Sequence, residues 1–170
     1  MAKVFIGIGS NIDPEENVRR ALSLLRKAVS VHAVSTFYRT RPVGVEGLPE
    51  FCNGIVEIET ALPPDELKRS VLARIEEDLG RVRTGNKYAS RTIDLDIVLY
   101  DAFAGSEDPD IARRAFLAIP LCELRPDLVL PSSGASIKEI AESMSKSDMK
   151  SLPELTEQLR RELQDEQSQS

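Results

Sequence analysis

The sequence predicts an α+β fold in which one antiparallel sheet carries its helices on one face. Three observations lead to this prediction. The length of 170 residues corresponds to one domain with enough chain for a full core. Segments of strand character and of helical periodicity follow one another in the order β-α-β-β-α-β, which is the ferredoxin-like pattern. No internal repeat interrupts that order.

The first predicted elements are a strand, a helix and two more strands. A buried strand is predicted over residues 3–9, because every residue after Lys3 is apolar or glycine. Asp13-Pro14-Glu15-Glu16 favours a helix start, with a capping Asp, Pro in the first turn and acids near the positive end of the helix dipole. Strands are predicted over 31–38 and 51–59. The residues between them, 40–50, hold two prolines and two glycines and predict a loop.

A second helix and the last strand of the pattern follow. Pro63-Pro64-Asp65-Glu66 favours the start of that helix, and Gly80 is expected to end it as a C-cap residue. Residues 92–99 predict a half-buried strand, because polar and apolar residues alternate from Thr92 to Ile97 and Leu99 continues the apolar face. We expect a short edge strand at 128–130 and a modest helix at 137–144.

We divide the chain into one domain over 1–144 and a polar C-terminal extension over 145–170. A leucine at every fourth position predicts a helix over 153–164. This helix either packs on the domain or mediates dimerisation. Residues 165–170 are polar and are expected to be disordered.

Charge and cysteine content narrow the class of function. The net charge is −6 and the pI is about 5.0, which argues against a nucleic-acid partner. Cys52 and Cys122 lie in apolar contexts without metal-ligand spacing, so we expect buried free thiols. No segment reaches transmembrane length and no signal peptide opens the chain. We therefore expect no membrane partner and a cytoplasmic location.

The strand over 92–99 carries the pattern with the clearest chemistry. Asp94 and Asp96 lie two positions apart, so their side chains share one face at a spacing of roughly 6–7 Å. Two carboxylates at that spacing repel each other unless a cation or a donor lies between them. Mg²⁺ fits this gap, because it takes one or two carboxylates and fills its shell with phosphate oxygens and water.

The residues before this strand supply the opposite charge. They are Arg81, Arg83, Lys87 and Arg91. Arginine forks suit phosphate oxygens. A cationic segment followed by a diacid strand therefore predicts a metal–nucleotide site. A solvated strand face is the alternative for Asp94 and Asp96 taken alone.

A second group of residues suits a flat heterocycle. Phe51 and Asn53 alternate onto one strand face, and an amide beside an aromatic ring matches a ligand rich in donors and acceptors. Asn is depleted in strands and needs partners when buried, whereas Phe51 is a core residue by default. Gly7 and Gly9 lack the spacing of a dinucleotide fingerprint. They let another backbone or a ligand approach their strand.

Six short motifs occur in a fixed order between Val4 and Pro131. They are Gly7-Ile8-Gly9-Ser10-Asn11, Phe37-Tyr38-Arg39-Thr40, Phe51-Cys52-Asn53, Gly80-Arg81-Val82-Arg83, Arg91-Thr92-Ile93-Asp94-Leu95-Asp96 and Pro120-Leu121-Cys122-Glu123-Leu124-Arg125-Pro126. With these motifs the chain resembles the 6-hydroxymethyl-7,8-dihydropterin pyrophosphokinase family of folate synthesis. The resemblance implies the ferredoxin-like fold and makes 1–144 the pyrophosphokinase-like domain. It also implies transfer of the β,γ-pyrophosphate of ATP to the hydroxymethyl oxygen of the pterin, with release of AMP.

The resemblance implies a role for each site residue. The implied ligands of two Mg²⁺ ions are Asp94 and Asp96, which form the catalytic set with Arg81, Arg83 and Arg91. The implied ATP-binding residues are Glu76, Arg81, Arg83, Tyr88, Arg91, Ile97 and Arg114. The implied pterin-binding residues are Thr40, Pro42, Val43, Phe51, Asn53 and Phe116. The implied partners are ATP and the pterin, and we expect a monomer or a weak homodimer. The chemistry needs no covalent enzyme intermediate, since such transfers depend on positioning and charge neutralisation.

The chain departs from the family pattern after the diacid strand. Glu107-Asp108-Pro109 stands where the family has a Pro-His-Pro-like element, and the sole histidine, His32, lies elsewhere. Loss of that histidine removes hydrogen bonds to ATP, and Asp108 adds repulsion if it faces phosphate. We therefore expect an active enzyme with a weaker hold on ATP.

Three other functions remain open from the sequence. A degenerate homologue would bind the pterin without catalysis. A two-metal phosphodiesterase could be built on Asp94, Asp96 and Glu76, although it would need no stacking pocket. A ferredoxin-like sheet can also bind RNA through exposed aromatics, but the acidic balance of this chain disfavours that reading.

Overall fold

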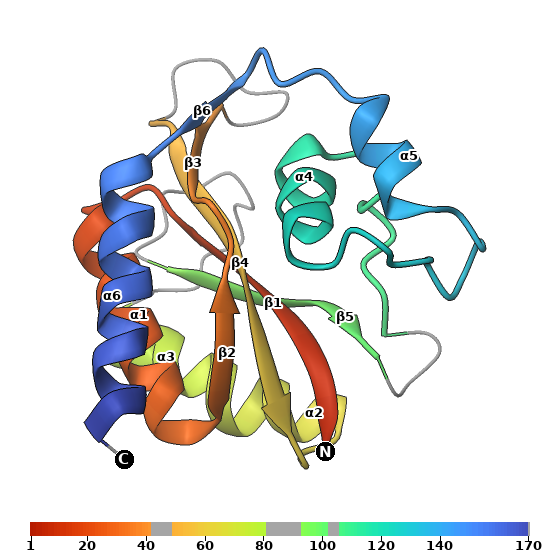
Figure 1. Ribbon diagram of the computed structural model, residues 1–170. Helices are drawn as coiled ribbons and strands as arrows, with labels where there is room; N and C mark the ends of the chain where they lie inside the picture. The colour runs from red at the N-terminus through yellow and green to blue at the C-terminus, as the bar shows by residue number, and fades with distance from the viewer. Residues whose placement is uncertain (42–48, 81–92, 102–105, 170) are drawn as a thin grey trace.

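The computed structural model describes residues 1–41, 49–80, 93–101 and 106–169. Its strands are β1 (Ala2–Ser10), β2 (Ser30–Val34), β3 (Tyr38–Thr40), β4 (Phe51–Thr60), β5 (Asp94–Tyr100) and β6 (Met149–Ser151). Its helices are α1 (Pro14–Ala28), α2 (Pro64–Glu66), the π-helical η1 (Leu67–Leu72), α3 (Ala73–Asp78), α4 (Ala115–Leu124), α5 (Ile137–Glu142) and α6 (Pro153–Gln169). Figure 1 shows these elements arranged around one sheet.

The sheet has β1 near its centre. Within the described residues it is six-stranded, in the order β5-β1-β4-β3-β6, and β2 also pairs with β4. The pairs β1–β4 and β1–β5 are both antiparallel. The predicted α+β class and its order of strands and helices are confirmed. This order places the predicted diacid strand directly beside β1.

The predicted strand over 31–38 is two strands in the structure. Ser35 interrupts it, with its N–H donating to Ile55 O at 2.9 Å and its Oγ accepting from Ile55 N at 2.9 Å. Phe37 is fully buried, and its ring fills the space beside Gly54, where a Cβ would lie 2.5 Å from the ring. The strand breaks because Phe37 has to enter the core at this point.

The predicted helices are present, but one cap differs. Asp13 has a left-handed backbone (φ 40°, ψ 54°) and makes no capping hydrogen bond with its side chain, so the predicted capping role is wrong. Asn17 Nδ2 donates instead to Ile12 O at 2.6 Å and ties the turn to the helix. Gly80 has a φ of 81°, as expected for a C-cap glycine. The second predicted helix is continuous over α2, η1 and α3, with a π-helical middle.

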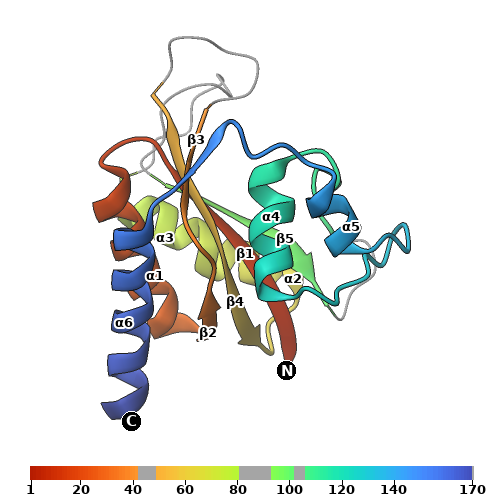
Figure 2. The same cartoon turned by 45° about the horizontal axis from the view of Figure 1, so that its top comes forward.

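Both faces of the sheet are covered. On one face, Ile6, Ile8 and other strand residues pack against α1, η1, α3 and α6, and together they form the first core cluster. The second joins Phe5 and Ile55 to α4 and α5 on the opposite face. Figure 2 shows α4 and α5 on one side of the sheet and α1 and α3 on the other. The sequence predicted helices on one face only, so α4 is an addition.

The C-terminal region belongs to the fold. Leu155, Leu159 and Leu163 are buried in the first core cluster, and the helix that they predicted is α6. The helix continues to Gln169, so the disorder expected from residue 165 onward is wrong for 165–169. The edge strand expected at 128–130 is also wrong. Its Val129 forms only an isolated bridge to Ser136, because this segment turns toward α5 and away from the sheet edge.

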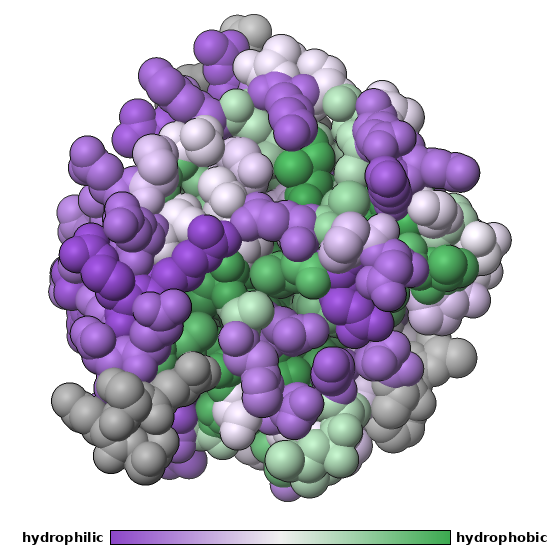
Figure 3. Space-filling model, in the orientation of Figure 1, coloured by the Kyte–Doolittle hydropathy of each residue, from purple (hydrophilic) through white to green (hydrophobic). Residues whose placement is uncertain are grey.

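Surface hydropathy follows the same layout. In Figure 3 hydrophobic residues gather over the sheet between α6 and α4, and hydrophilic residues cover the α6 side. Both cysteines are free, as expected; Cys52 is buried as predicted, whereas Cys122 is only half-buried. Within the described part of the chain, no helix combines the length and apolar character needed to cross a membrane.

Candidate active site

The central strand β1 carries two glycines on the sheet face that it shares with α4. Phe5 points into the second core cluster, so Gly7 and Gly9 fall on that face by alternation. Gly9 is paired with Asn53 of β4 on one side and with Asp94 of β5 on the other. Paired residues of antiparallel strands project from the same face. Gly9 therefore lies between an amide and a carboxylate, with roughly 10 Å between the strands that carry them. We call this part of the sheet, with Gly9 between Asn53 and Asp94, the floor.

The amide side of this floor is fixed by hydrogen bonding. Asn53 Nδ2 donates to Thr40 Oγ1 at 2.6 Å, and Thr40 is buried on the neighbouring strand β3. A Cβ added at Gly9 would lie 2.5 Å from Asn53 Oδ1, so the amide reaches over Gly9. An amide held in this way presents an acceptor and a second N–H to a ligand.

Two aromatic rings lie on the same side of the sheet. Phe51 is half-buried and shares the Asn53 face of β4 by alternation. Phe116 is half-buried in the first turn of α4 and packs against the second core cluster. The sequence named both rings, but it could not show that α4 covers this face.

The acidic side of the floor is the start of β5. Asp94 is half-buried and Asp96 is exposed, although the surrounding protein crowds the Asp96 carboxyl. The pKa of Asp96 is raised to about 7. Loss of hydration is the largest cause, and the negative charge of Asp94, a hydrogen bond to Asp94 and the charge of Glu76 add to it. Lys68 of η1 opposes the shift. The two carboxyls therefore repel each other, as the sequence spacing predicted.

Glu76 supports this strand from the core side. It is only 4% exposed, on α3, and its Oε2 accepts a hydrogen bond from Leu95 N at 3.3 Å. Leu95 lies between the two aspartates, so Glu76 holds the backbone that carries them. The structure thus gives Glu76 a supporting position beneath the diacid.

The diacid suits an open Mg²⁺ site better than a closed metal centre. Among the residues that the structure describes, no group of three or more His, Cys, Asp and Glu side chains is arranged to hold a metal ion. Two carboxylates leave most of an octahedral shell for phosphate oxygens and water, which is how Mg²⁺ binds with nucleotides. The repulsion between Asp94 and Asp96 also favours a cation there.

The remaining predicted residues divide into two groups. Those that lie outside the described residues are Pro42, Val43, Arg81, Arg83, Tyr88 and Arg91. Ile97 is half-buried against the first core cluster, and Arg114 is the N-cap residue of α4. These positions place Ile97 on β5 with the diacid and Arg114 next to Phe116.

The segment that departs from the family pattern follows β5 closely. Asp108 N donates to Val98 O at 2.8 Å, and the Asp108 carboxylate accepts from Asp110 N at 2.8 Å. Glu107 accepts a hydrogen bond from Ser132 N at 3.3 Å. Both acidic side chains therefore have partners within the protein.

Two residues near the site were not singled out from the sequence. Lys68 is exposed on η1 and acts on the charge of Asp96. Tyr38 is paired with Asn53 across β3 and β4, and burial and then Glu123 raise the pKa of its phenol. Tyr38 belongs to one of the six motifs, which was the available signal. Pairing of β3 with β4 identifies Tyr38, and the proximity of η1 to β5 identifies Lys68; neither contact can be read from the sequence.

Comparison with known proteins gives a consistent family. The model of the family "7,8-dihydro-6-hydroxymethylpterin-pyrophosphokinase (HPPK)" matches residues 5–126. The chain is 37% identical over 142 residues to a 2-amino-4-hydroxy-6-hydroxymethyldihydropteridine pyrophosphokinase of Haemophilus influenzae, covering 78% of this chain and 88% of that protein. It is 40% identical over 129 residues to the protein of the same name from Bacillus subtilis, covering 71% and 76%.

Solved structures agree on the fold. The chain is similar to the crystal structure of Plasmodium falciparum HPPK-DHPS wild type with SDX-DHP, with a TM-score of 0.62 and 11% identity. The match covers 89% of this chain and 47% of that one, so the chain spans about half the length of that larger protein. At this identity the likeness establishes the fold alone.

Proposed function

The chain belongs to the 7,8-dihydro-6-hydroxymethylpterin-pyrophosphokinase family, and we propose that the face built on β1, β4 and β5 carries its reaction. The enzyme transfers pyrophosphate from ATP to the hydroxymethyl group of 6-hydroxymethyl-7,8-dihydropterin, in folate biosynthesis. The family resemblance noted in the sequence is confirmed. A two-metal phosphodiesterase and a degenerate homologue are not favoured.

One observation carries the assignment of this reaction to this face. Gly9 is paired with Asn53 on one side and with Asp94 on the other. An amide that suits a pterin ring therefore lies two strands away from a carboxylate that suits a magnesium nucleotide. A phosphodiesterase would have no use for the amide, and a pterin-binding protein would have no use for the diacid.

The residues on each side of the floor have distinct tasks. Asn53, held by Thr40, binds the edge of the pterin ring, and Phe51 and Phe116 flank it. Asp94 and Asp96 hold Mg²⁺, in two ions as the resemblance implies, and Glu76 keeps their strand in place. When bound, the metal neutralises phosphate charge. The other ATP-binding residues are those that the resemblance implies: Arg81, Arg83, Tyr88, Arg91, Ile97 and Arg114, with Pro42 and Val43 on the pterin side.

The balance of the reaction follows from its substrates. The hydroxymethyl oxygen of the pterin attacks the β-phosphorus of ATP, and the bond from that phosphorus to the oxygen bridging the α-phosphate breaks. AMP leaves with the bridging oxygen, and the hydroxyl proton is released. The protein contributes by holding the two substrates in line, which accounts for much of the rate gain in such transfers.

The experiment that tests this function measures AMP by chromatography after purified protein is mixed with ATP, Mg²⁺ and 6-hydroxymethyl-7,8-dihydropterin. We expect AMP only when the pterin is present. Asp94→Asn and Asp96→Asn should each lower turnover at least about a hundredfold, because metal neutralisation of phosphate contributes several kcal/mol. Asp101→Asn, at an exposed acid just beyond β5, is the matched control and should retain activity.

Other outcomes point elsewhere. AMP without the pterin would indicate a phosphohydrolase, and pterin binding without AMP would indicate a degenerate homologue. Turnover that survives both aspartate changes would contradict the metal assignment.

The proposal also includes the location and the oligomeric state of the enzyme. A cytoplasmic location fits the acidic chain with two free cysteines, and α6 packed on the core fits a monomer or a weak homodimer. Sedimentation velocity at micromolar concentration checks the oligomeric state. A tight dimer would contradict the proposal.

A further inference from the structure

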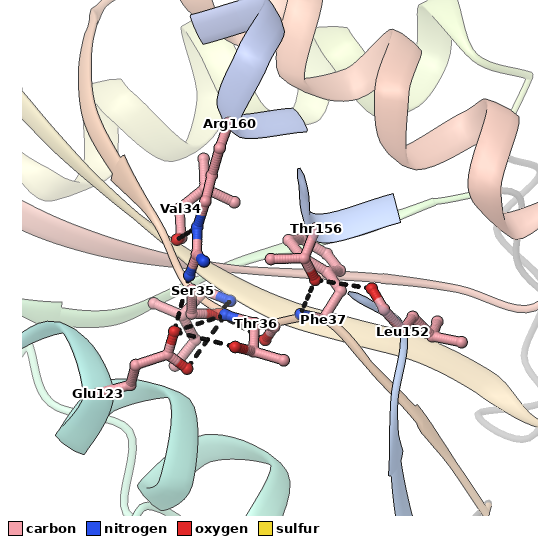
Figure 4. A network of polar contacts seen from close by, with 9 residues as sticks. Val34, Ser35, Thr36, Phe37, Glu123, Leu152, Thr156 and Arg160 are labelled. Carbon is pink, nitrogen blue, oxygen red and sulfur yellow. Dashed lines mark hydrogen bonds and ion pairs between the residues drawn. The ribbon is translucent and has the colours of Figure 1, made fainter. Parts of the chain in front are cut away.

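The C-terminal helix α6 binds the segment that leads into the pterin side of the site. Residues 34–37 run from the last residue of β2 to the start of β3. Phe37 N donates to Thr156 Oγ1 at 2.9 Å, and Arg160 Nε donates to Val34 O at 3.0 Å (Figure 4). Thr156 is buried, with 4% of its surface exposed. Two side chains of α6 therefore hold both ends of this short connection.

The same contact extends into the backbone of the C-terminal region. Thr156 Oγ1 also donates to Leu152 O at 2.8 Å, and Leu152 N donates to Phe37 O at 2.8 Å. Next to it, β6 pairs with β3, so that Tyr38 lies opposite Ser151. The C-terminal region thus covers the edge of β3 and closes a ring of hydrogen bonds around Phe37.

Glu123 of α4 also binds this connection, through hydrogen bonds to Thr36. Its carboxylate accepts from Thr36 N at 2.9 Å, from Thr36 Oγ1 at 3.0 Å and from Arg160 Nη2 at 2.7 Å. The Arg160 contact is a charge-assisted hydrogen bond between partly exposed side chains, so it fixes the geometry of the connection more than it adds stability. Arg160 therefore joins α6, the connection and α4, and α4 carries Phe116 in its first turn.

The connection leads directly to the residues of the floor. Tyr38, the residue after Phe37, is paired with Asn53, and two positions further Thr40 accepts the Asn53 hydrogen bond. A shift of residues 34–37 would therefore move the partner of the pterin-binding amide. The diacid is on β5, on the opposite side of β1, and has no contact with this network among the residues shown in Figure 4.

We propose that Thr156 and Arg160 are positioning residues for the pterin substrate, which hold residues 34–37 so that Thr40 and Phe116 stay in place around Asn53. This inference rests on the proposed assignment of Thr40, Asn53 and Phe116 to the pterin. The family match ends at residue 126, so both positioning residues lie beyond it. A segment outside the matched region thus completes one half of the substrate site.

Point variants test this role, because removing α6 would also remove three core leucines. Thr156→Val deletes the hydroxyl and keeps the shape, and Arg160→Met deletes the guanidinium and keeps the aliphatic stem. Each should raise the KM for the pterin roughly tenfold, the effect of about one lost hydrogen bond, with the KM for ATP unchanged. Thr156→Ser should restore the wild-type KM. Arg161→Met, at the exposed neighbouring position, is the matched control.

All assays are run at a temperature at which circular dichroism shows every variant folded. The inference is overturned if the two KM values rise together, if only kcat falls, or if Thr156→Val and Arg160→Met leave the pterin KM unchanged. Calorimetric titration of the pterin into the same variants separates this result from failure of the proposed function. Wild type that binds the pterin without forming AMP contradicts the reaction, whereas a Kd that Thr156→Val and Arg160→Met leave unchanged contradicts the positioning role.

Discussion

At the scale of single residues, Gly9 matters for what lies on each side of it. Its neighbours across the sheet are Asn53 and Asp94, and the amide oxygen of Asn53 occupies the space that a Cβ would need. The sequence predicted that Gly9 lies in a strand, but it could not show which residues of neighbouring strands are paired with Gly9. Because Gly9 is paired with Asn53, the amide can take its observed position only if residue 9 has no Cβ.

Gly9→Ala is expected to weaken pterin binding. A Cβ at 2.5 Å from Asn53 Oδ1 forces the amide to turn and lose its hydrogen bond to Thr40. The KM for the pterin should rise about tenfold in steady-state assays. Gly7→Ala is the control, since its Cβ would meet Val98 Cγ2 at 3.2 Å and leave Asn53 in place. An equal rise in Gly7→Ala would show that lost space, and not a displaced amide, is the cause.

Asp96 makes the metal-free protein sensitive to pH. The pKa of its carboxyl is raised from 3.8 to about 7, so the folded state binds this proton more tightly than the unfolded state. Stability therefore falls as pH rises from about 4 through 7 and stays lower above that window. The cost arises first from the lost hydration of the ionised Asp96 carboxylate and then from its neighbours Asp94 and Glu76, and a bound cation would reduce it.

Asp96→Asn is accordingly expected to stabilise the protein without Mg²⁺ at pH 8. The exposed side chain reduces the effect to a rise in Tm of about 2–4 °C, and the difference should vanish toward pH 4. Scanning calorimetry at both pH values measures it, with Asp101→Asn as the control. A difference of the same size at pH 4 and pH 8 would argue against the raised pKa.

At the scale of elements, the C-terminal helix α6 is part of the main core. Leu159 is fully buried in the first core cluster, together with residues of α1 and the sheet. Arg19 of α1 and Glu162 of α6 also form an ion pair at 2.9 Å, which is partly exposed and contributes little by itself. Burial of apolar side chains therefore supplies the stability with which α6 packs on the sheet, and its polar contacts fix its exact orientation.

Leu159→Ala should lower the free energy of unfolding by about 2–5 kcal/mol, because it removes buried methyl groups and leaves a cavity. Urea denaturation followed by circular dichroism measures this loss. Glu157→Ala, at an exposed position of the same helix, should change stability by less than about 0.5 kcal/mol. A comparably small effect of Leu159→Ala would mean that α6 unfolds separately from the sheet.

At the scale of the whole molecule, one sheet connects two cores and carries both sides of the proposed substrate site. Helices α1, η1, α3 and α6 cover one face, and α4 and α5 cover part of the other. The floor that we propose for the substrates lies on the α4 face, so its residues are held by strands whose opposite face packs on the first core cluster. Ligands that bind this floor should therefore stabilise the complete fold.

Mg²⁺ with a non-hydrolysable ATP analogue, at a hundred times its Kd, should raise the free energy of unfolding by about 2.7 kcal/mol. The double variant Asp94→Asn/Asp96→Asn should lose this increment and keep the increment that the pterin provides. Thermal denaturation with each ligand separates the two. A nucleotide increment that persists in the double variant would remove the diacid from the nucleotide site.

The order of elements, the diacid and the Phe51–Asn53 face could be predicted because they depend on local periodicity. A strand alternates every second residue, so Asp94 and Asp96 had to share a face wherever the strand lay. Helix α4 could not be predicted in the same way. Five consecutive residues, 117–121, are buried and Pro120 lies inside the helix, so no polar face marks its period.

The local sequence thus accounts for the family, the sheet and the chemical character of each side of the floor. Only the tertiary structure shows three further features. They are the pairing around Gly9, the break between β2 and β3 at Ser35, and the hydrogen bonds from α6 to residues 34–37. Phe37 meets Thr156 across 119 positions and Val34 meets Arg160 across 126. Such partners are chosen by register and packing, which depend on the complete core and leave no periodic trace in either segment.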